Sequence, residues 1–319
     1  MMKALVRDRY GKPDVLRVEE VDRPPLEDDR VLVRVKASSV NRAEWYGLTG
    51  RPLLARPMMG GIRRPKTRLI GTDFAGVVEA VGKSVEGFAV GDEVFGGRDG
   101  AYAEYVAAKT FAHKPANVSF EEAGCVGIAG LTALQAVRDH GELRAGDRVL
   151  VNGASGGVGT MTVQIAKALG GQVTAVCSTR NVERMHGLGA DRVLDYTQED
   201  FTRKGDRYDL VIDVAGSRSW RELRRVLAPG ARVVVVGAPS GTPFFGPLTH
   251  IAAVKIASRG KARFFVAKFR TADLETLAGF MSSGQLKPAI DRSYSLAETP
   301  QALSAMGEGH VRGKLVLTI

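Results

Sequence analysis

A glycine-rich stretch, Ala154-Ser155-Gly156-Gly157-Val158-Gly159, has the residue types and the spacing of a phosphate-binding turn. It follows an apolar run at Val149–Val151 and precedes a helix-like pattern that ends at Gly170-Gly171. Bare amide groups at the start of a helix, together with the helix dipole, can receive a pyrophosphate. A second apolar run at Val173–Val176 completes the order strand, turn, helix, strand. This order predicts a unit that binds a dinucleotide.

Two glycines of this turn have distinct expected roles. The usual pattern is G-x-G-x-x-G, and Ala154 replaces its first glycine, which is acceptable where the backbone φ is negative. Gly156 is expected to let the backbone approach the pyrophosphate, and Gly159 to let the helix pack closely on the strand. An ordinary glycine-rich turn is the alternative. The cofactor contacts predicted in this turn are Ser155, Gly156, Gly157 and Val158.

The residues after the second strand indicate which dinucleotide is bound. Folds that prefer NAD carry an acid about 20 residues past the glycines, where it binds the ribose hydroxyls. Here the sequence reads Cys177-Ser178-Thr179-Arg180, and the first acid is Glu183. Ser178, Thr179 and Arg180 offer two hydroxyls and a guanidinium, which suit a 2′-phosphate. We therefore predict NADPH rather than NADH, with a solvated Arg180 as the alternative.

The pattern around this unit predicts two parts of different kind. Short apolar runs separated by Gly, Pro and Asp occupy the first 110 or so residues and indicate a compact barrel or sandwich. Strands then alternate with helices up to about residue 267, which predicts an α/β fold with a doubly wound parallel sheet. Its strands are expected at 149–152, 173–177, 192–195, 209–214, 232–237 and 263–267. A helix at 271–283 and a last strand at 314–318 follow.

Composition excludes several classes of protein. The 319 residues are 44% hydrophobic and 25% charged, which is typical of a globular protein. No stretch approaches the roughly 20 apolar residues of a membrane span, and the N-terminus lacks the apolar core of a signal peptide. The two cysteines, Cys125 and Cys177, have neither disulfide nor metal-like spacing. A reducing cytoplasm is therefore the expected location.

The net charge of +10 gathers partly in two basic segments, 51–68 and 255–270. Most of these side chains are expected to be solvated, and their field can attract a polyanionic cofactor. No recognition motif for nucleic acid accompanies the charge, so a nucleic-acid partner is not expected.

Several motifs occur in a fixed order along nearly the whole chain. They are Asn41-Arg42-Ala43-Glu44-Trp45-Tyr46, Gly71-Thr72-Asp73-Phe74-Ala75-Gly76, Gly91-Asp92-Glu93-Val94-Phe95, Gly130-Leu131-Thr132-Ala133-Leu134, the glycine-rich turn, Leu188-Gly189-Ala190-Asp191 and Arg312-Gly313-Lys314-Leu315-Val316-Leu317. Together they resemble the medium-chain dehydrogenase/reductase superfamily, and within it the zinc-free, zeta-crystallin-like quinone oxidoreductase branch. The resemblance implies a GroES-like β-barrel substrate domain of residues 1–128 and 270–319, and a Rossmann domain of residues 129–269. It places the active site in a cleft between them.

Zinc ligands are missing at the positions where this superfamily carries them. Zinc alcohol dehydrogenases hold the catalytic metal with a cysteine, a histidine and a further cysteine or acid. By resemblance, Asn41 stands at the first of these positions, Thr72 at the second and Ile128 near the third. The stretch from Gly96 to His113 matches the structural zinc lobe and has no cysteine. We therefore expect catalysis without a metal.

An acceptor that needs no metal is one that spreads the added charge. A quinone, or the β-carbon of an enone, takes a hydride into a conjugated system, so modest hydrogen-bond donors suffice. By resemblance, Asn41 and Tyr46 lie in the cleft and orient the substrate or the nicotinamide. Tyr46 is the candidate donor to the developing oxygen anion. A turn cap for Asn41 and a packing role for Tyr46 are the alternatives.

The resemblance also implies further contacts with the cofactor. Thr132 lies on the helix that faces the nicotinamide in relatives, and Tyr196 matches a tyrosine near the adenosine phosphate. The other implied contacts follow the fourth, fifth and sixth strands of the sheet, where loops at the carboxyl edge meet a ligand: Val214, Gly237, Ala238, Phe265 and Val266. Plain turn chemistry is the alternative for each.

We therefore expect an NADPH-dependent, zinc-independent oxidoreductase that transfers hydride to quinones or α,β-unsaturated carbonyls. The resemblance to this family also implies a homodimer. The alternative among enzymes is a reductase of enoyl thioesters or similar alkenes. The alternative outside enzymes is an NADPH-binding protein with a structural or RNA-binding role, as described for zeta-crystallin relatives.

Overall fold

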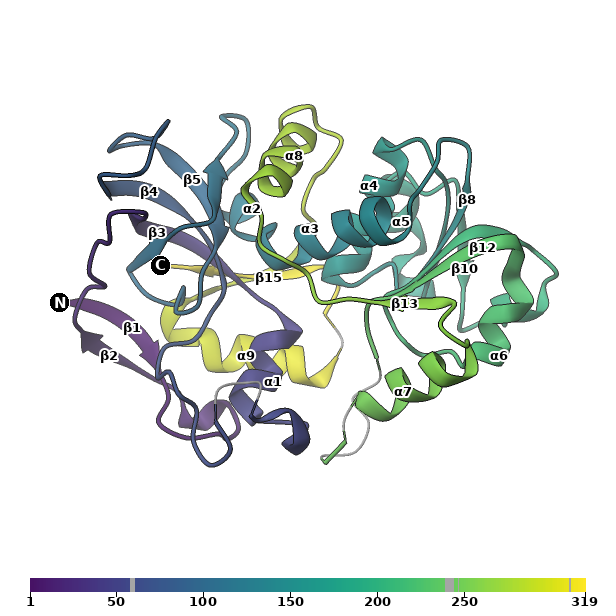
Figure 1. The fold of residues 1–319 in the computed structure, drawn as a ribbon, viewed down its shortest axis with the longest axis horizontal. Helices are drawn as coiled ribbons and strands as arrows, with labels where there is room; N and C mark the ends of the chain where they lie inside the picture. The colour runs from purple at the N-terminus through teal and green to yellow at the C-terminus, as the bar shows by residue number, and fades with distance from the viewer. Residues whose placement is uncertain (58–60, 239–243, 246, 310) are drawn as a thin grey trace. The chain divides into compact units, whose positions relative to one another are not determined.

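The computed structural model describes residues 1–319 except 58–60, 239–243, 246 and 310 (Figure 1). The chain forms two compact units. Unit 1 comprises Met1–Leu131, Phe269–Gly284 and Ile290–Ile319, and unit 2 comprises Thr132–Lys268 and Gln285–Ala289. None of the described helices is both long enough and apolar enough to cross a membrane.

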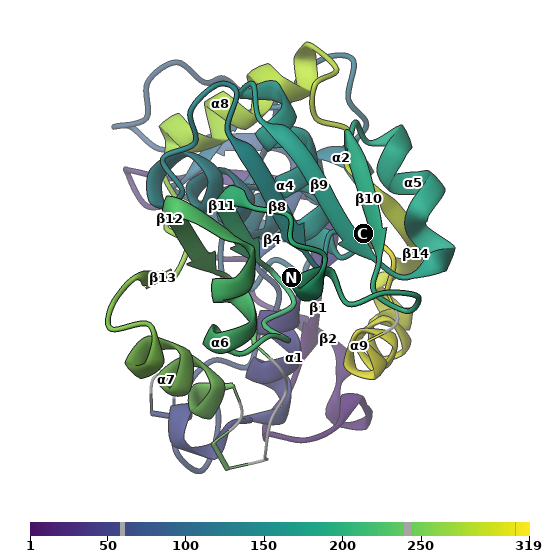
Figure 2. The same cartoon turned by 90° about the vertical axis from the view of Figure 1, so that its right-hand side faces the viewer.

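Unit 2 is built on a six-stranded parallel sheet with the order β10-β9-β8-β11-β12-β13 (Figure 2). The strands are β8 Arg148–Asn152, β9 Gln172–Cys177, β10 Arg192–Asp195, β11 Tyr208–Asp213, β12 Leu227–Val235 and β13 Ala262–Phe264. The first strand of the unit thus lies between the second and the fourth. This is the strand order of a Rossmann fold, in which ligands bind at the carboxyl edge where the order reverses. The predicted α/β class with a doubly wound parallel sheet is confirmed.

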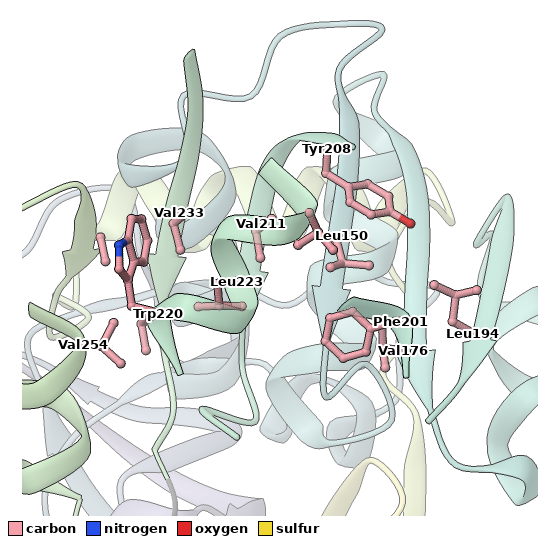
Figure 3. Close-up of a cluster of buried hydrophobic side chains, with 13 residues drawn as sticks. Leu150, Val176, Leu194, Phe201, Tyr208, Val211, Trp220, Leu223, Val233 and Val254 are labelled. Carbon is pink, nitrogen blue, oxygen red and sulfur yellow. The ribbon is translucent and has the colours of Figure 1, made fainter. Parts of the chain in front are cut away.

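Helices precede and connect these strands. They are the π-helix η3 Gln135–His140, the α-helices α4 Gly157–Ala168, α5 Val182–Gly187, α6 Trp220–Leu223 and α7 Leu248–Ala257, and the short 3-10 helices η4 Thr179–Asn181, η5 Phe201–Arg203 and η6 Arg224–Val226. Figure 3 shows the apolar cluster that several of them share with the sheet. Phe201, Trp220 and Leu223 pack there against buried strand residues that include Leu150 and Val211. This shared core packs the strands together, and so it determines where their carboxyl ends lie.

Unit 1 contains a seven-stranded sheet in the order β14-β15-β3-β4-β5-β7, with β6 paired to β3, and a separate pair of strands, β1 and β2. The strands are β1 Met2–Val6, β2 Arg17–Val21, β3 Val31–Val40, β4 Asp73–Val81, β5 Glu93–Gly97, β6 Tyr105–Ala108, β7 Phe111–His113, β14 Ile290–Ser295 and β15 Lys314–Thr318. The helices are α1 Arg42–Thr49, α2 Phe120–Gly124, α8 Thr271–Ser282 and α9 Thr299–Glu308, with short turns η1 Pro13–Val15, η2 Leu53–Ala55 and η7 Leu296–Glu298. A further helix, α3 Gly127–Leu134, spans the division between the units.

The C-terminal strand completes the N-terminal sheet of unit 1. β15 pairs antiparallel with β3, and Leu315 lies opposite Val40 in the register. Lys314 is therefore brought next to the end of β3, where α1 begins.

Candidate cofactor and active site

The glycine-rich turn of unit 2 leaves the start of α4 open. α4 begins after Gly156, and no side chain caps its first turn. The four predicted contacts of this turn, 155–158, are half-buried, whereas Ala154 and Gly159 are buried. The first turn of an uncapped helix presents unpaired amide groups and the positive end of the helix dipole. This arrangement suits an anion such as a pyrophosphate.

The glycines of the turn differ in what surrounds them. A Cβ on Gly159 would lie 2.2 Å from the carbonyl oxygen of Gly153. The helix can therefore approach the turn this closely only with glycine at position 159. A Cβ on Gly156 would meet nothing nearer than 3.9 Å, so the space beside it is open. The left-handed backbone belongs to Gly153, with φ of +82°, one residue before Ala154. Ala154 is not among the residues with positive φ, so it fits the first position of the pattern.

Asn152 and Asp213, which were not predicted as site residues, join the carboxyl ends of β8 and β11. Asp213 Oδ1 accepts hydrogen bonds from Asn152 Nδ2 at 2.7 Å and from the Gly216 amide at 2.8 Å. Burial raises the pKa of the Asp213 carboxyl to about 6, and its Oδ2 atom has no hydrogen-bond partner among the described residues. An acid directly after the apolar run 210–212 is the signal in the sequence that could have indicated Asp213.

The residues directly after β11 and directly after β12 pack against one another. A Cβ on Gly216 would lie 2.2 Å from the Gly237 carbonyl oxygen, and a Cβ on Gly237 would lie 1.9 Å from the Val214 carbonyl oxygen. The predicted contacts Val214, Gly237 and Ala238 are therefore brought together at the carboxyl edge of the sheet.

Ser178, Thr179 and Arg180 lie directly beyond the end of β9. Arg180 is exposed, and the described residues offer its guanidinium neither a hydrogen bond nor an ion pair. Ser178 Oγ accepts a hydrogen bond from Asn181 Nδ2 at 3.1 Å, which leaves the Ser178 hydroxyl hydrogen available. These two side chains can therefore bind a ligand without first giving up a partner.

An acid from the neighbouring strand lies beside Thr179. Asp195 is the last residue of β10, and its Oδ2 accepts a hydrogen bond from Thr179 Oγ1. Its Oδ1 accepts hydrogen bonds from the amide and the hydroxyl of Thr197, at 2.9 and 2.7 Å. Tyr196, between them, is 53% exposed. No acid follows β9 directly in the sequence, but the parallel sheet places one there from β10.

The segment after β13 is hydrogen-bonded to the π-helix η3. Gln135 Nε2 donates to the Lys268 carbonyl at 2.7 Å, and the Lys268 amide donates to Gln135 Oε1 at 3.0 Å. Phe265 stacks on His140 with ring centroids 4.2 Å apart, whereas Val266 is 87% exposed. The predicted contacts Phe265 and Val266 thus differ, because only the valine side chain is open to solvent. Thr132 is half-buried on α3.

The polar centre of unit 1 is a buried group of side chains, called here the Asp73 cluster: Ser39, Asn41, Glu44, Asp73 and Lys314. Asp73 Oδ2 accepts hydrogen bonds from Ser39 Oγ at 2.7 Å and from Asn41 Nδ2 at 2.9 Å. Lys314 Nζ lies 3.6 Å from the same oxygen and donates to Asn41 Oδ1. The side chains of Asp73 and Lys314 are 0% and 2% exposed. They form a fully buried ion pair.

The other carboxylate oxygen of Asp73 holds the start of α3. Asp73 Oδ1 accepts a hydrogen bond from the Ile128 amide at 2.6 Å. A Cβ on Gly127, the first residue of α3, would lie 2.3 Å from that oxygen. Negative charge at a helix N-terminus is favourable, so Asp73 stabilises the first turn of the helix that carries Thr132.

Glu44 carries the second buried carboxyl of the cluster. Its Oε2 accepts a hydrogen bond from the Asn41 amide at 2.8 Å, and its Oε1 is buried without a hydrogen-bond partner. Burial, and secondly the charge of Asp73, raise the pKa of Glu44 to about 7, while the nearby Thr72 and Lys314 side chains act in the opposite direction.

Glu44 is expected to make the protein less stable as the pH rises from about 4.5 to about 7. Over this range the folded carboxyl keeps its proton and the unfolded one loses it, so the free energy of unfolding falls. Over this pH range the free energy of unfolding of the wild type should fall by up to roughly 3 kcal/mol relative to that of Glu44→Gln. Urea unfolding of both proteins from pH 4 to 8 measures this difference, with the exposed Glu275→Gln as control. Parallel curves would contradict it.

The two residues predicted to be catalytic differ in availability. Asn41 occupies the N-cap position of α1, and its side chain is hydrogen-bonded to Asp73 and Lys314. Tyr46 is half-buried on α1, and no described residue pairs with its hydroxyl. Of the two, Tyr46 therefore has the side chain that is free to donate to a ligand.

In the part of the chain that the structure describes, no set of three or more His, Cys, Asp or Glu side chains is placed to hold a metal ion.

Known proteins match both parts of the chain. Residues 27–116 match the family described as alcohol dehydrogenase GroES-like domain, and residues 188–317 the family described as zinc-binding dehydrogenase. A chloroplastic quinone oxidoreductase from Triphysaria versicolor is 34% identical over 99% of this chain and 98% of its own length. An NADPH-dependent alkenal/one oxidoreductase from Arabidopsis thaliana is 31% identical over 99% of this chain and 79% of its own length. The solved quinone oxidoreductase from Coxiella burnetii is 30% identical, with a TM-score of 0.86 over 100% of this chain and 99% of that one.

Proposed function

Because the chain belongs to the medium-chain dehydrogenase/reductase superfamily, in its quinone oxidoreductase branch, we propose that it transfers hydride from NADPH to quinones or α,β-unsaturated carbonyls. It is an oxidoreductase that uses a nicotinamide cofactor. The substrates in the names of its relatives support the choice of acceptor. The observation that carries the cofactor site is the uncapped start of α4 with open space beside Gly156.

The residues of unit 2 fit NADPH, which would supply the hydride. The amides at 155–158 would bind the pyrophosphate, and the free guanidinium of Arg180 would bind the 2′-phosphate through paired hydrogen bonds. Ser178 would add a hydroxyl donor to the same phosphate. The other proposed contacts are Thr132, Thr179, Tyr196, Val214, Gly237, Ala238, Phe265 and Val266.

The donor set in unit 1 supports a reaction without a metal. Lys314 already donates a hydrogen bond to the side-chain oxygen of Asn41, and the side chain of Ile128 has no atom that can bind a metal. A reaction without a Lewis acid needs an acceptor that delocalises charge and a simple hydrogen-bond donor. We propose that the Tyr46 hydroxyl is this donor, and that Asn41 positions α1, the helix that carries Tyr46.

The test is NADPH consumption with a panel of quinones, enones and enoyl thioesters, before and after treatment with a chelator. We expect turnover of a quinone or an enone, unchanged by chelation. Turnover confined to enoyl thioesters would replace the proposed acceptor. Tight NADPH binding without turnover would favour a binding protein with a structural or RNA-binding role. Activity that is lost on chelation and restored by zinc would overturn the metal-free reaction.

Arg180→Ala is expected to raise the KM for NADPH by roughly 10- to 100-fold, because it removes charged hydrogen bonds to a phosphate. The KM for NADH should change less than about twofold, since NADH lacks that phosphate. Steady-state kinetics with both cofactors measure the effect. Arg221→Ala, at an exposed arginine of α6, controls for the loss of one positive charge. Equal effects of Arg180→Ala on both cofactors would contradict the assignment.

We also propose a homodimer and a cytoplasmic location. β13 is an edge strand, and the apolar side chains of Val266 and Ile256 near it are 87% and 78% exposed, which suits a protein interface. Both cysteines are free and buried, which suits a reducing compartment. Molar mass from light scattering tests the dimer, and fractionation of cells tests the location.

A further inference from the structure

We propose that Asp195 is a second determinant of cofactor choice, which opposes Arg180 and allows the site to bind NADH as well as NADPH. The inference rests on the proposed cofactor site in unit 2. It assigns to β10 the acid that β9 lacks.

The sheet brings Asp195 to the position where a ribose-binding acid is expected. β9 and β10 are parallel neighbours, and Asp195 lies opposite Cys177 at their carboxyl ends. Ser178 and Thr179 follow directly, and Thr179 Oγ1 donates to Asp195. In folds that bind NAD, the acid that accepts the ribose hydroxyls lies at this end of the second strand. Here the same place is reached from the third strand.

Three hydrogen bonds hold the Asp195 carboxylate in one orientation. Thr179 Oγ1 donates to its Oδ2, and the amide and the hydroxyl of Thr197 donate to its Oδ1. These bonds, that of Thr179 first, lower the pKa of the carboxyl, so it is ionised near neutral pH. The residue is only partly buried, so a ribose hydroxyl can reach the remaining lone pairs.

The same contacts change what Thr179 can do. Its single hydroxyl hydrogen is directed to Asp195 or to Thr197 Oγ1, which lies 2.9 Å away. Thr179 therefore cannot also donate to a 2′-phosphate. The phosphate is left with Arg180 and Ser178 as donors, and it lies near a fixed negative charge that repels it. A free 2′-hydroxyl, in contrast, can donate to that charge.

The test compares the Kd values of NADPH and NADH, measured by titration calorimetry on the wild type and Asp195→Asn. The amide keeps the shape of the side chain and an oxygen that can accept from Thr179. We expect NADPH to bind more tightly and NADH more weakly, so the ratio of the NADH Kd to the NADPH Kd rises about tenfold. Asp191→Asn, at an exposed acid just before β10, should leave the ratio unchanged.

The other outcomes overturn either the role of Asp195 alone or the whole cofactor site. An unchanged ratio, or a shift towards NADH, overturns the role of Asp195 while the cofactor site stands. Failure of the wild type to bind either dinucleotide overturns the cofactor site and this inference together. If Asp195→Asn does not fold, Asp195→Ser carries the same expectation, since it also removes the charge.

Discussion

Lys314→Met is expected to lower the free energy of unfolding by about 3–5 kcal/mol, because it leaves the Asp73 carboxylate buried without its counter-ion. The pair is excluded from water, with side-chain exposures of 0% for Asp73 and 2% for Lys314. The substitution also removes the hydrogen bond to Asn41 Oδ1. Methionine fills a similar volume, so the lost charge and not a cavity accounts for the effect. Urea unfolding at pH 7 measures it.

The double variant Asp73→Asn with Lys314→Met separates charge from shape. It removes both charges and is expected to recover a large part of the loss, since the introduced amide can still accept from the Ile128 amide. Lys255→Met, at an exposed lysine of α7, should change the free energy of unfolding by less than about 0.5 kcal/mol. A double variant that is no more stable than Lys314→Met alone would show that the ion pair is not the source of the loss.

The strands of unit 2 could be predicted from the sequence because buried parallel strands are continuous apolar runs. The prediction for β13 was too long, since it extended to 267 and the strand ends at Phe264. Beyond that point the Lys268 backbone pairs with the side chain of Gln135, not with a strand. In unit 1, β14 and α9 were not predicted. β14 is an edge strand with little burial, so it lacks the alternation of apolar and polar residues that marks a strand.

The side-chain pairs of the candidate site could not be predicted, since their partners are distant in sequence. The resemblance singled out the motifs that contain Asp73 and Lys314, but the pair exists only because β15 joins β3. The role of Asp195 could not be predicted for a related reason. The rule for a ribose-binding acid counts residues along the chain from the glycines. The sheet, however, places the last residue of the adjacent strand β10 beside the end of β9. Local spacing identifies the turn, and only the tertiary fold identifies its neighbours.

Gly156→Ala is expected to weaken NADPH binding by one to two orders of magnitude while the protein remains as stable as the wild type. The backbone at Gly156 has φ of −81° and ψ of 175°, which alanine adopts freely, and a Cβ there meets nothing nearer than 3.9 Å. The added methyl group would occupy the space through which a pyrophosphate reaches the amides of α4. Calorimetric titration with NADPH and urea unfolding measure the two effects separately.

Gly159→Ala is the matched variant with the opposite expectation. Its Cβ would lie 2.2 Å from the Gly153 carbonyl oxygen and 2.8 Å from the Ala154 backbone, so α4 must move away from the turn. We expect a loss of several kcal/mol in the free energy of unfolding, because backbone cannot yield as a flexible side chain does. The same methyl group, three residues apart, should therefore act on binding in one case and on folding in the other. If Gly156→Ala binds NADPH as tightly as the wild type, the pyrophosphate does not lie against this turn.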